Sequence, residues 1–177
     1  MTFRRAATLA LALGLLLAAC SDDPAVGDGS PAARNATQAP LLPTTVAALP
    51  SMDVDGFHEL LGQLKGTPVV VNVWGSWCPP CIAEASLLHD AAARYGDRIQ
   101  FVGVDILDDR GDAAGFIAEH GLLYPSVFDP DGAIRDDLGS VGQPVTVFID
   151  ADGNEVDRVD GQLSAESLQE GLDRLLG

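Results

Sequence analysis

A pair of cysteines, Cys78 and Cys81, separated by two prolines, is the feature that most constrains this chain. The pair follows an almost unbroken apolar run over residues 69–74 and precedes an apolar helical pattern that lasts to about Tyr95. This order predicts a buried strand that delivers both cysteines onto the first turn of a helix. The free N–H groups and positive partial charge of that turn favour a thiolate and lower the thiol pKa below its free value of about 8.5. Two thiols at this spacing can also close into a disulfide and open again.

The two cysteines are not equivalent in this pattern. Cys81 begins an apolar stripe with alternating spacings of four and three residues, which we expect to face the core. The stripe continues through Ala85, Leu88, Ala92 and Tyr95. Cys78 lies at or just before the first helical residue, where we expect the chain to be exposed, so Cys78 is the candidate nucleophile and Cys81 the resolving thiol. Pro79 and Pro80 fit between them because the first turn of a helix needs no N–H partners.

A metal site is the main alternative for such a cysteine pair. Structural zinc usually takes four ligands, most often from two such pairs. The third cysteine of the chain is Cys20, and the three histidines, at positions 58, 89 and 120, are scattered. The strand-then-helix context therefore favours a redox pair, and we expect no bound metal and no diffusible cofactor. A purely structural disulfide is disfavoured, because closing so small a loop removes little chain entropy.

Residues 1–19 have the pattern of a secretory signal peptide. Arg4 and Arg5 form a short positive region, and residues 6–19 are apolar but too few for a comfortable membrane span. Residues 17–20, Leu-Ala-Ala-Cys, resemble the lipobox of bacterial lipoproteins, in which the signal is cut before a cysteine that carries diacylglycerol. We therefore expect Cys20 to be lipidated, which also accounts for the odd number of cysteines. An ordinary cleaved signal and an uncleaved anchor are the alternatives.

The rest of the chain divides into a tether and one domain. Residues 20–50 are predicted to be a disordered tether, since they are rich in small residues and proline and lack the apolar periodicity of a core. Short apolar patches at residues 41–42 and 46–49 could dock onto the domain. Residues 51–177 are long enough for a single core and are expected to form that domain. The formal net charge of −16 argues against nucleic acid as a partner.

The expected elements of this domain alternate between helices and strands. Helices are predicted over residues 55–64, from the cysteine pair to 95, over 112–120 and after Ser164, with a helical turn at 135–138. Strands are predicted over residues 69–74, 99–106, 125–128, 145–149 and 155–159, the last two joined by a hairpin at Asp152-Gly153. This order predicts an α/β fold in which a central mixed sheet is covered by helices on both faces.

Four sequence blocks in this order resemble thioredoxin-fold proteins, and most closely the TlpA/ResA-type membrane-anchored thiol–disulfide oxidoreductases. The first block is the strand and loop at residues 69–81, and the second is Glu84, three residues after the second cysteine. The third block, residues 124–129, resembles the insert of that family. The fourth, residues 142–150, resembles the loop and strand that carry its cis-proline. The resemblance implies a thioredoxin-like fold from about residue 53 to the C-terminus.

The resemblance also implies roles for individual residues. Pro144 matches the family's cis-proline, which faces the cysteine pair and offers backbone groups to a substrate strand. Gln143, Pro79 and Pro80 would contact the same substrate segment. Trp77 matches the tryptophan that flanks the nucleophile, where it shields a partner's disulfide.

One position departs from thioredoxin. Asn72 occupies the place of a buried aspartate, and an amide cannot take a proton at neutral pH. Cys81 must lose a proton before it can attack a mixed disulfide, and Glu84, one turn further along the helix, is the candidate to assist. The alternative is that Glu84 only complements the helix dipole.

The implied activity is thiol–disulfide exchange with exported proteins through Cys78 and Cys81, outside the cytoplasm and at the membrane of a bacterium. The resemblance favours the reducing direction, with apocytochrome c as substrate and a membrane thiol carrier as electron donor. Two alternatives remain open. The direction depends on a reduction potential that sequence does not determine, so the protein could be a disulfide-forming oxidant. The pair could also bind Cu(I) in a metallochaperone, although no histidine or methionine clusters beside it.

We predict that Cys20 is the N-terminus of the mature protein and carries the lipid. Mass spectrometry of the membrane fraction should find Cys20 with diacylglycerol and no peptide from residues 1–19, because a lipobox signal is cut directly before its cysteine. The Cys20→Ala variant should lack the lipid mass. An unmodified N-terminus downstream of Cys20 in the native protein would contradict this prediction.

Overall fold

The computed structural model of the chain describes residues 40–177. The expected signal peptide, Cys20 and residues 21–39 of the expected tether lie outside these residues. The described part contains five strands and five helices in the order that the sequence predicts. Within it, no helix is both long enough and apolar enough to cross a membrane.

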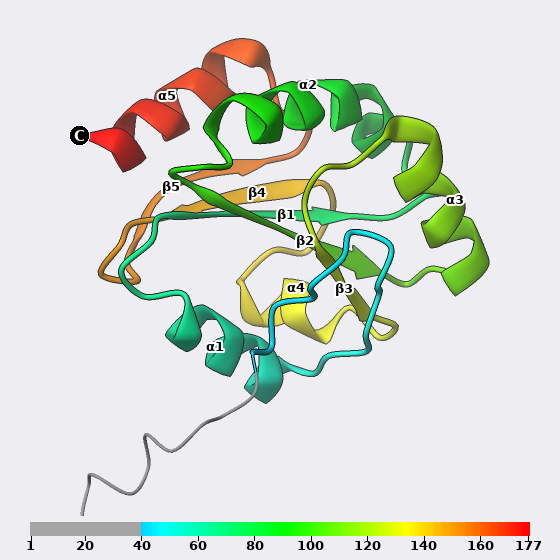
Figure 1. Cartoon of the computed structure of the whole chain (residues 1–177). Helices are drawn as coiled ribbons and strands as arrows, with labels where there is room; N and C mark the ends of the chain where they lie inside the picture. Colours follow the sequence, from blue (N-terminus) through cyan, green and yellow to red (C-terminus); the bar gives the residue numbers. More distant parts are fainter. Residues whose placement is uncertain (1–39) are drawn as a thin grey trace, which may run out of the picture. The chain divides into compact units, whose positions relative to one another are not determined.

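The five strands form one mixed sheet with β1 at its centre (Figure 1). β1 (Val69–Trp74) pairs in parallel with β2 (Gln100–Ile106), which pairs in parallel with β3 (Ser126–Asp129) at one edge. On its other side β1 pairs antiparallel with β4 (Val145–Ile149), which pairs antiparallel with β5 (Glu155–Asp160). Every residue of β1 is buried, as its valine-rich run predicts for the middle strand of a covered sheet.

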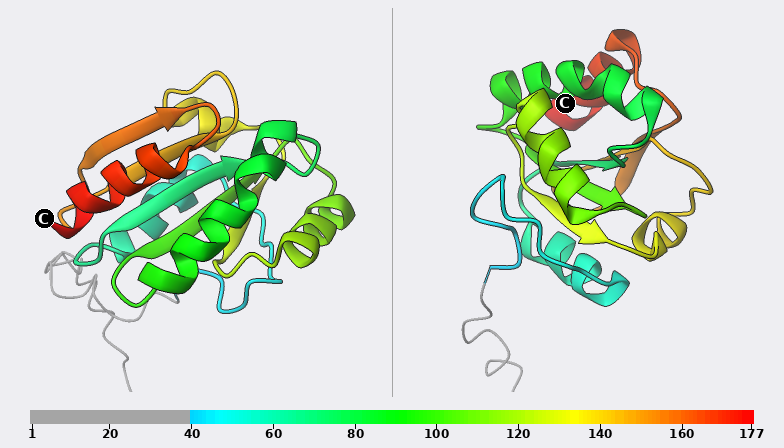
Figure 2. Two further views of the ribbon diagram at one scale, coloured as in Figure 1. Left: turned by 90° about the horizontal axis from the view of Figure 1, so that it is seen from above. Right: turned by 90° about the vertical axis from the view of Figure 1, so that its right-hand side faces the viewer.

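Helices cover both faces of the sheet, which confirms the predicted α/β arrangement (Figure 2). α2 (Pro79–Tyr95), α3 (Arg110–His120) and α5 (Ala165–Leu176) pack on one face. α1 (Val54–Gln63) and the short α4 (Ala133–Asp137) pack on the other. Because successive residues of a strand point to opposite faces, β1 contributes side chains to two separate cores.

The two cores hold β1 from both sides. Val71 lies in the core shared with α1 and α4, opposite Val102 of β2 and Val147 of β4. Trp74, the last residue of β1, lies in the other core, where its ring stacks on that of Phe116 in α3 at a centroid distance of 4.6 Å. The cysteine loop that follows Trp74 therefore begins at a firmly packed point.

The end of the expected tether packs on the domain. The backbone N–H of Phe128 in β3 donates to the Pro50 carbonyl at 2.8 Å, and the Phe128 carbonyl accepts from Met52 at 3.0 Å. The Arg110 guanidinium lies 4.1 Å from the centre of the Phe128 ring. Apolar side chains of residues 41–49 pack against the two cores. This segment covers a sheet edge that would otherwise be free to pair with another chain.

Several element boundaries differ from the predicted ones by one or two residues, and capping explains two of these differences. α3 begins at Arg110 rather than at residue 112, because the Asp109 side chain accepts from a backbone N–H of the first turn. α4 is a helix of five residues rather than a turn at 135–138, because the Asp129 side chain accepts from the first two N–H groups of that helix. β3 also ends at Asp129, one residue later than predicted.

Candidate active site

The cysteine pair lies on the first turn of α2, directly after β1, as the sequence predicts. Cys78 is the N-cap residue, with an extended backbone, and Pro79 and Pro80 occupy the first two helical positions. The backbone N–H of Cys81 donates to the Cys78 sulfur at 3.3 Å. The prolines have no N–H, so of the first three helical positions Cys81 alone can donate to the N-cap side chain.

Cys78 and Cys81 are joined in a disulfide with an S–S distance of 2.05 Å. Each of the two residues is 2% exposed. The expected burial of Cys81 is confirmed, whereas the prediction that Cys78 is exposed is wrong for this oxidised state. The bond to Cys81 and the hydrogen bond from its N–H turn the Cys78 sulfur toward the helix start instead of toward solvent. A reacting partner must therefore reach the disulfide past the residues around it.

The rim around the disulfide is apolar and exposed. Trp77 is 47% exposed, and its indole N–H donates to the Leu107 carbonyl at 3.1 Å. Leu107 has a φ of 53°, a left-handed conformation that is uncommon for a residue other than glycine. Leu107 itself is also well exposed, and so is Ile82 in the first turns of α2. This rim is the surface that a partner would meet first, with Trp77 directly before Cys78.

Glu84 lies one turn after Cys81 on the same side of α2 and is buried. Its Oε1 accepts from Nδ2 of Asn72 in β1 at 2.9 Å, and its Oε2 accepts from the backbone N–H of Leu163, just before α5, at 2.6 Å. The Asn72 amide also donates to Oγ1 of Thr146 in β4 at 3.3 Å. Glu84 is therefore an interior carboxyl group with specific partners rather than a surface acid.

Burial raises the pKa of Glu84 above its usual value and outweighs the two hydrogen bonds, which act in the opposite direction. Burial also raises the pKa of Tyr124, and the negative charge of Glu84 adds to that rise. Tyr124 belongs to the segment before β3 that resembles the family insert. This segment therefore lies close enough to Glu84 for the charge of Glu84 to act on it. A carboxyl group with a raised pKa close to Cys81 accepts a proton more readily than an ordinary surface glutamate.

The Gln143–Pro144 peptide bond is cis, as the family resemblance implies. Pro144 is buried and directly precedes Val145, which lies opposite Val73 in the sheet. Because β1 and β4 run antiparallel, the start of β4 and the end of β1 meet at one edge of the sheet. Pro144 and the cysteine loop therefore share that edge.

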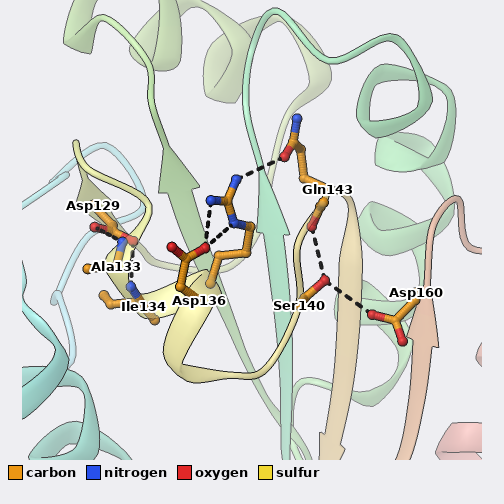
Figure 3. A network of polar contacts seen from close by, with 9 residues as sticks. Asp129, Ala133, Ile134, Asp136, Ser140, Gln143 and Asp160 are labelled. Carbon is orange, nitrogen blue, oxygen red and sulfur yellow. Dashed lines mark hydrogen bonds and ion pairs between the residues drawn. The ribbon is translucent and has the colours of Figure 1, made fainter.

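Polar contacts hold the loop before β4 (Figure 3). Arg135 of α4 donates through Nη1 to the side-chain oxygen of Gln143 at 3.4 Å. The Ser140 hydroxyl lies 3.1 Å from the Gly142 carbonyl and 3.2 Å from the Asp160 carboxylate at the end of β5. The Gln143 side chain was expected to contact substrate. Its oxygen instead points toward Arg135 in α4.

Two open hollows adjoin the site. One has a volume of about 330 Å³ and is lined by the loop at residues 139–144 together with Asp160 and Gly161. The other has a volume of about 410 Å³ and is lined by Ser76, Ile82 and residues of α3. Each hollow borders a segment that flanks the cysteine pair, so both are candidate surfaces for a partner's polypeptide segment.

Sequence reasoning missed two carboxyl groups near the cysteine loop. Asp108, between β2 and α3, accepts from the backbone N–H of Ser76 at 2.5 Å and from its hydroxyl at 2.8 Å. Asp105, opposite Trp74 in the sheet, is fully buried, and neither of its oxygens has a hydrogen-bond partner within residues 40–177. Burial, and then the charge of Asp108, raise the pKa of Asp105 to about 8. Asp108 follows the end of a strand, where an acid usually belongs to a solvated turn, so the pattern carried no signal for it. Asp105 lies inside the predicted strand between Val104 and Ile106, and an acid within such an apolar run is the signal that could have marked it.

The fold and the cysteine pair together define a class, the thioredoxin-like proteins that carry a Cys-x-x-Cys disulfide at the start of a helix. A solved structure of a secreted Mycobacterium tuberculosis disulfide oxidoreductase, described as homologous to E. coli DsbE, has this fold. It matches with a TM-score of 0.59 and 32% sequence identity, over 64% of this chain and 86% of that one.

The chain belongs to the Redoxin family, whose sequence pattern matches residues 25–175. Among relatives, the thiol:disulfide interchange protein DsbE of Escherichia coli K12 is 40% identical over 107 residues, which cover 59% of this chain and 56% of DsbE. The thiol-disulfide oxidoreductase ResA of Bacillus thuringiensis is 27% identical over 124 residues, or 70% of this chain and 72% of ResA. The expected relationship to ResA-type proteins is thus confirmed at the level of the family, although the match spans little more than half of DsbE.

We predict that Glu84→Gln slows the attack of Cys81 on a mixed disulfide by about 100-fold, because the amide cannot accept the proton of the Cys81 thiol. Stopped-flow measurement of thiol release from a mixed disulfide on Cys78 gives this rate. In the native protein the rate should rise with pH through the raised pKa of Glu84, and the variant should lose that rise. Glu170→Gln, on the exposed face of α5, is the matched control. Equal rates and equal pH profiles for the native protein and Glu84→Gln would show that Glu84 has only a structural role.

Proposed function

We propose that the protein is a lipid-anchored thiol–disulfide oxidoreductase that reduces disulfides of exported proteins outside the cytoplasm. The observation that carries the proposal is the Cys78–Cys81 disulfide on the first turn of α2, with the buried carboxyl group of Glu84 one turn further on. Two-step disulfide exchange requires a nucleophilic thiolate, a resolving thiol and a group that takes the proton of the resolving thiol. The geometry supports these three roles for Cys78, Cys81 and Glu84.

The reaction transfers two electrons from the cysteine pair to the substrate. The Cys78 thiolate attacks one sulfur of a substrate disulfide, and the other substrate sulfur leaves as a thiolate that takes up a proton. Cys81 then gives its proton to Glu84 and attacks the Cys78 sulfur, which breaks the mixed disulfide and releases the second substrate thiolate. The pair is left as a disulfide, and a thiol donor must reduce it before the next cycle.

The two prolines between the cysteines support the reducing direction. A pair becomes more oxidising when its reduced form is stabilised, which happens when the thiolate of the N-cap cysteine receives hydrogen bonds. N-cap side chains accept from the second and third helical positions. Pro80 removes the donor at the second position, so the Cys78 thiolate keeps the single donor of Cys81.

The relatives support the compartment and the substrate class. DsbE and ResA are thiol–disulfide exchange proteins by name, and the M. tuberculosis protein is described as secreted. For this chain the family resemblance favours the disulfide of apocytochrome c, so cytochrome c maturation is the proposed process. A membrane thiol carrier supplies the electrons, because the compartment outside the cytoplasm is oxidising. The lipid on Cys20 holds the protein near that carrier.

We predict that Pro80→Ala makes the pair more oxidising by about 30 mV or more. The new N–H at the second helical position can donate to the thiolate, and a hydrogen bond to a charged group contributes about 1.5 kcal/mol or more. Equilibration with dithiol buffers of known potential measures the shift. Pro79→Ala is the matched control, because the N–H at the first helical position does not point to the N-cap side chain. Equal shifts in both variants, or none in either, would remove the support that the prolines give to the reducing direction.

We predict that Cys81→Ala accumulates as mixed disulfides with its substrates, because Cys78 can still attack but nothing releases the product. Cys78→Ala should trap few partners, since its remaining thiol at position 81 is buried. Non-reducing gels of cell envelopes, with the bands identified by mass spectrometry, make the comparison. Apocytochrome c among the adducts would support the proposed process.

Other outcomes of the same experiment would replace parts of the proposal. Heavier adducts from Cys78→Ala would reverse the roles of the two cysteines. If the Cys78–Cys81 pair of the native protein becomes reduced rather than oxidised when it reacts with the trapped substrate, the protein is a disulfide-forming oxidant. No adducts from either variant, together with tight Cu(I) binding, would favour the metallochaperone, although residues 40–177 contain no group of three or more His, Cys, Asp or Glu side chains that could hold a metal ion.

A further inference from the structure

Asp105 is a buried acid beside the cysteine loop that the exchange reaction above does not use. It is the sixth residue of β2 and lies opposite Trp74, the last residue of β1 before the loop. Val104 and Ile106 point into the core shared with α1 and α4, so the Asp105 side chain points to the other face, where α2 and α3 pack. Asp105 therefore lies on the same side of the sheet as the disulfide.

This carboxyl group destabilises the fold where it stands. It is fully buried, and within the described part of the chain neither of its oxygens has a hydrogen-bond partner. Burial of a polar group without a partner is costly, and of an ionised carboxylate far more so. An uncharged side chain of the same shape would be more stable here. A costly acid retained next to a reactive centre is a candidate for a functional role.

The charged neighbours of Asp105 connect it to the cysteine loop. Asp108, three residues further along the chain, interacts with it most strongly, and Asp129 at the end of β3 adds to the repulsion, whereas Arg110 in α3 attracts it. The Asp108 carboxylate accepts both the backbone N–H and the hydroxyl of Ser76, two residues before Cys78. A change in the charge of Asp105 thus acts directly on the group that holds the loop.

We propose that Asp105 is a positioning residue, which keeps the cysteine loop closed over the disulfide while it is protonated and loosens the loop when it ionises. The proposal rests on the proposed thiol–disulfide exchange at Cys78. Protonated Asp105 leaves Asp108 free to hold Ser76, and Cys78 stays buried. Ionised Asp105 repels Asp108, which weakens the contacts to Ser76 and exposes the Cys78 sulfur. The raised pKa of about 8 puts this change just above neutral pH.

The first test follows the backbone amide of Ser76 by NMR in the oxidised protein, between pH 6 and 9. The cysteines do not titrate in this state, so a titration there comes from another group. In the native protein the Ser76 signal should shift with a midpoint near pH 8. Asp105→Asn and Asp108→Asn should both abolish that shift, and the exposed Asp112→Asn in α3 should retain it. A shift that persists in Asp105→Asn, or its absence in the native protein, would overturn the proposal.

The second test follows stability with pH. Because the folded pKa of Asp105 lies above the unfolded value of 3.8, the unfolded chain releases this proton first as pH rises. This group therefore lowers stability progressively between about pH 4 and pH 8. The gain in melting temperature of Asp105→Asn over the native protein should grow across the same range. A constant or absent gain would show that the burial of Asp105 carries no pH response.

The third test measures how fast dithiothreitol reduces the disulfide, as the rate per dithiothreitol thiolate. In the native protein this rate should rise several-fold from pH 7 to pH 9, because the Cys78 sulfur becomes accessible. In Asp105→Asn it should stay flat. A rise of the same size in both proteins would limit Asp105 to a structural role. The first two tests need no turnover, so their failure is distinguishable from a failure of the proposed exchange activity itself.

Discussion

The hydrogen bonds of Glu84 hold together the parts of the structure on which the disulfide depends. Its carboxyl group lies in α2 and accepts from Asn72 in β1 and from Leu163 before α5, partners that are 12 and 79 residues away in the chain. A buried carboxyl group that loses its partners is strongly destabilising, so these contacts resist any shift of α2 against the sheet. The helix start that presents Cys78 and Cys81 is oriented by the same constraint.

Two interior acids near one disulfide behave differently because their surroundings differ. Glu84 has two N–H partners, whereas Asp105 has none among residues 40–177, yet burial raises the pKa of both. The partnered acid keeps a defined geometry close to Cys81 and is suited to proton transfer. Asp105 has no such hydrogen bond within the described part of the chain, and its charge is coupled to that of Asp108. Because both pKa values are raised in the folded state, both acids lower the free energy of unfolding as pH rises. A core without buried acids would not lose stability in this way.

The surface around the disulfide is held by segments that are distant in the sequence. The β2–α3 loop supports the residues before Cys78 through the contact of Asp108 with Ser76 and that of the Leu107 carbonyl with Trp77. On the other side, α4 and β5 hold the loop that leads to the cis-proline (Figure 3). A partner would therefore meet a surface whose shape is set by segments distant in the sequence, with both cysteines buried beneath it.

The sequence by itself determined the elements and the chemistry of this protein. The valine-rich run of β1 and the apolar stripe that starts at Cys81 are local periodic patterns, and local patterns are enough to predict a strand, a helix and the side that each buries. The resemblance of residues 142–150 to a known loop was enough for the cis state of Pro144. Only the tertiary structure decided that Cys78 is covered, that Leu163 bonds Glu84 and that Asp105 has no partner within residues 40–177. These properties depend on how segments far apart in the chain pack against one another, and no local pattern encodes that packing.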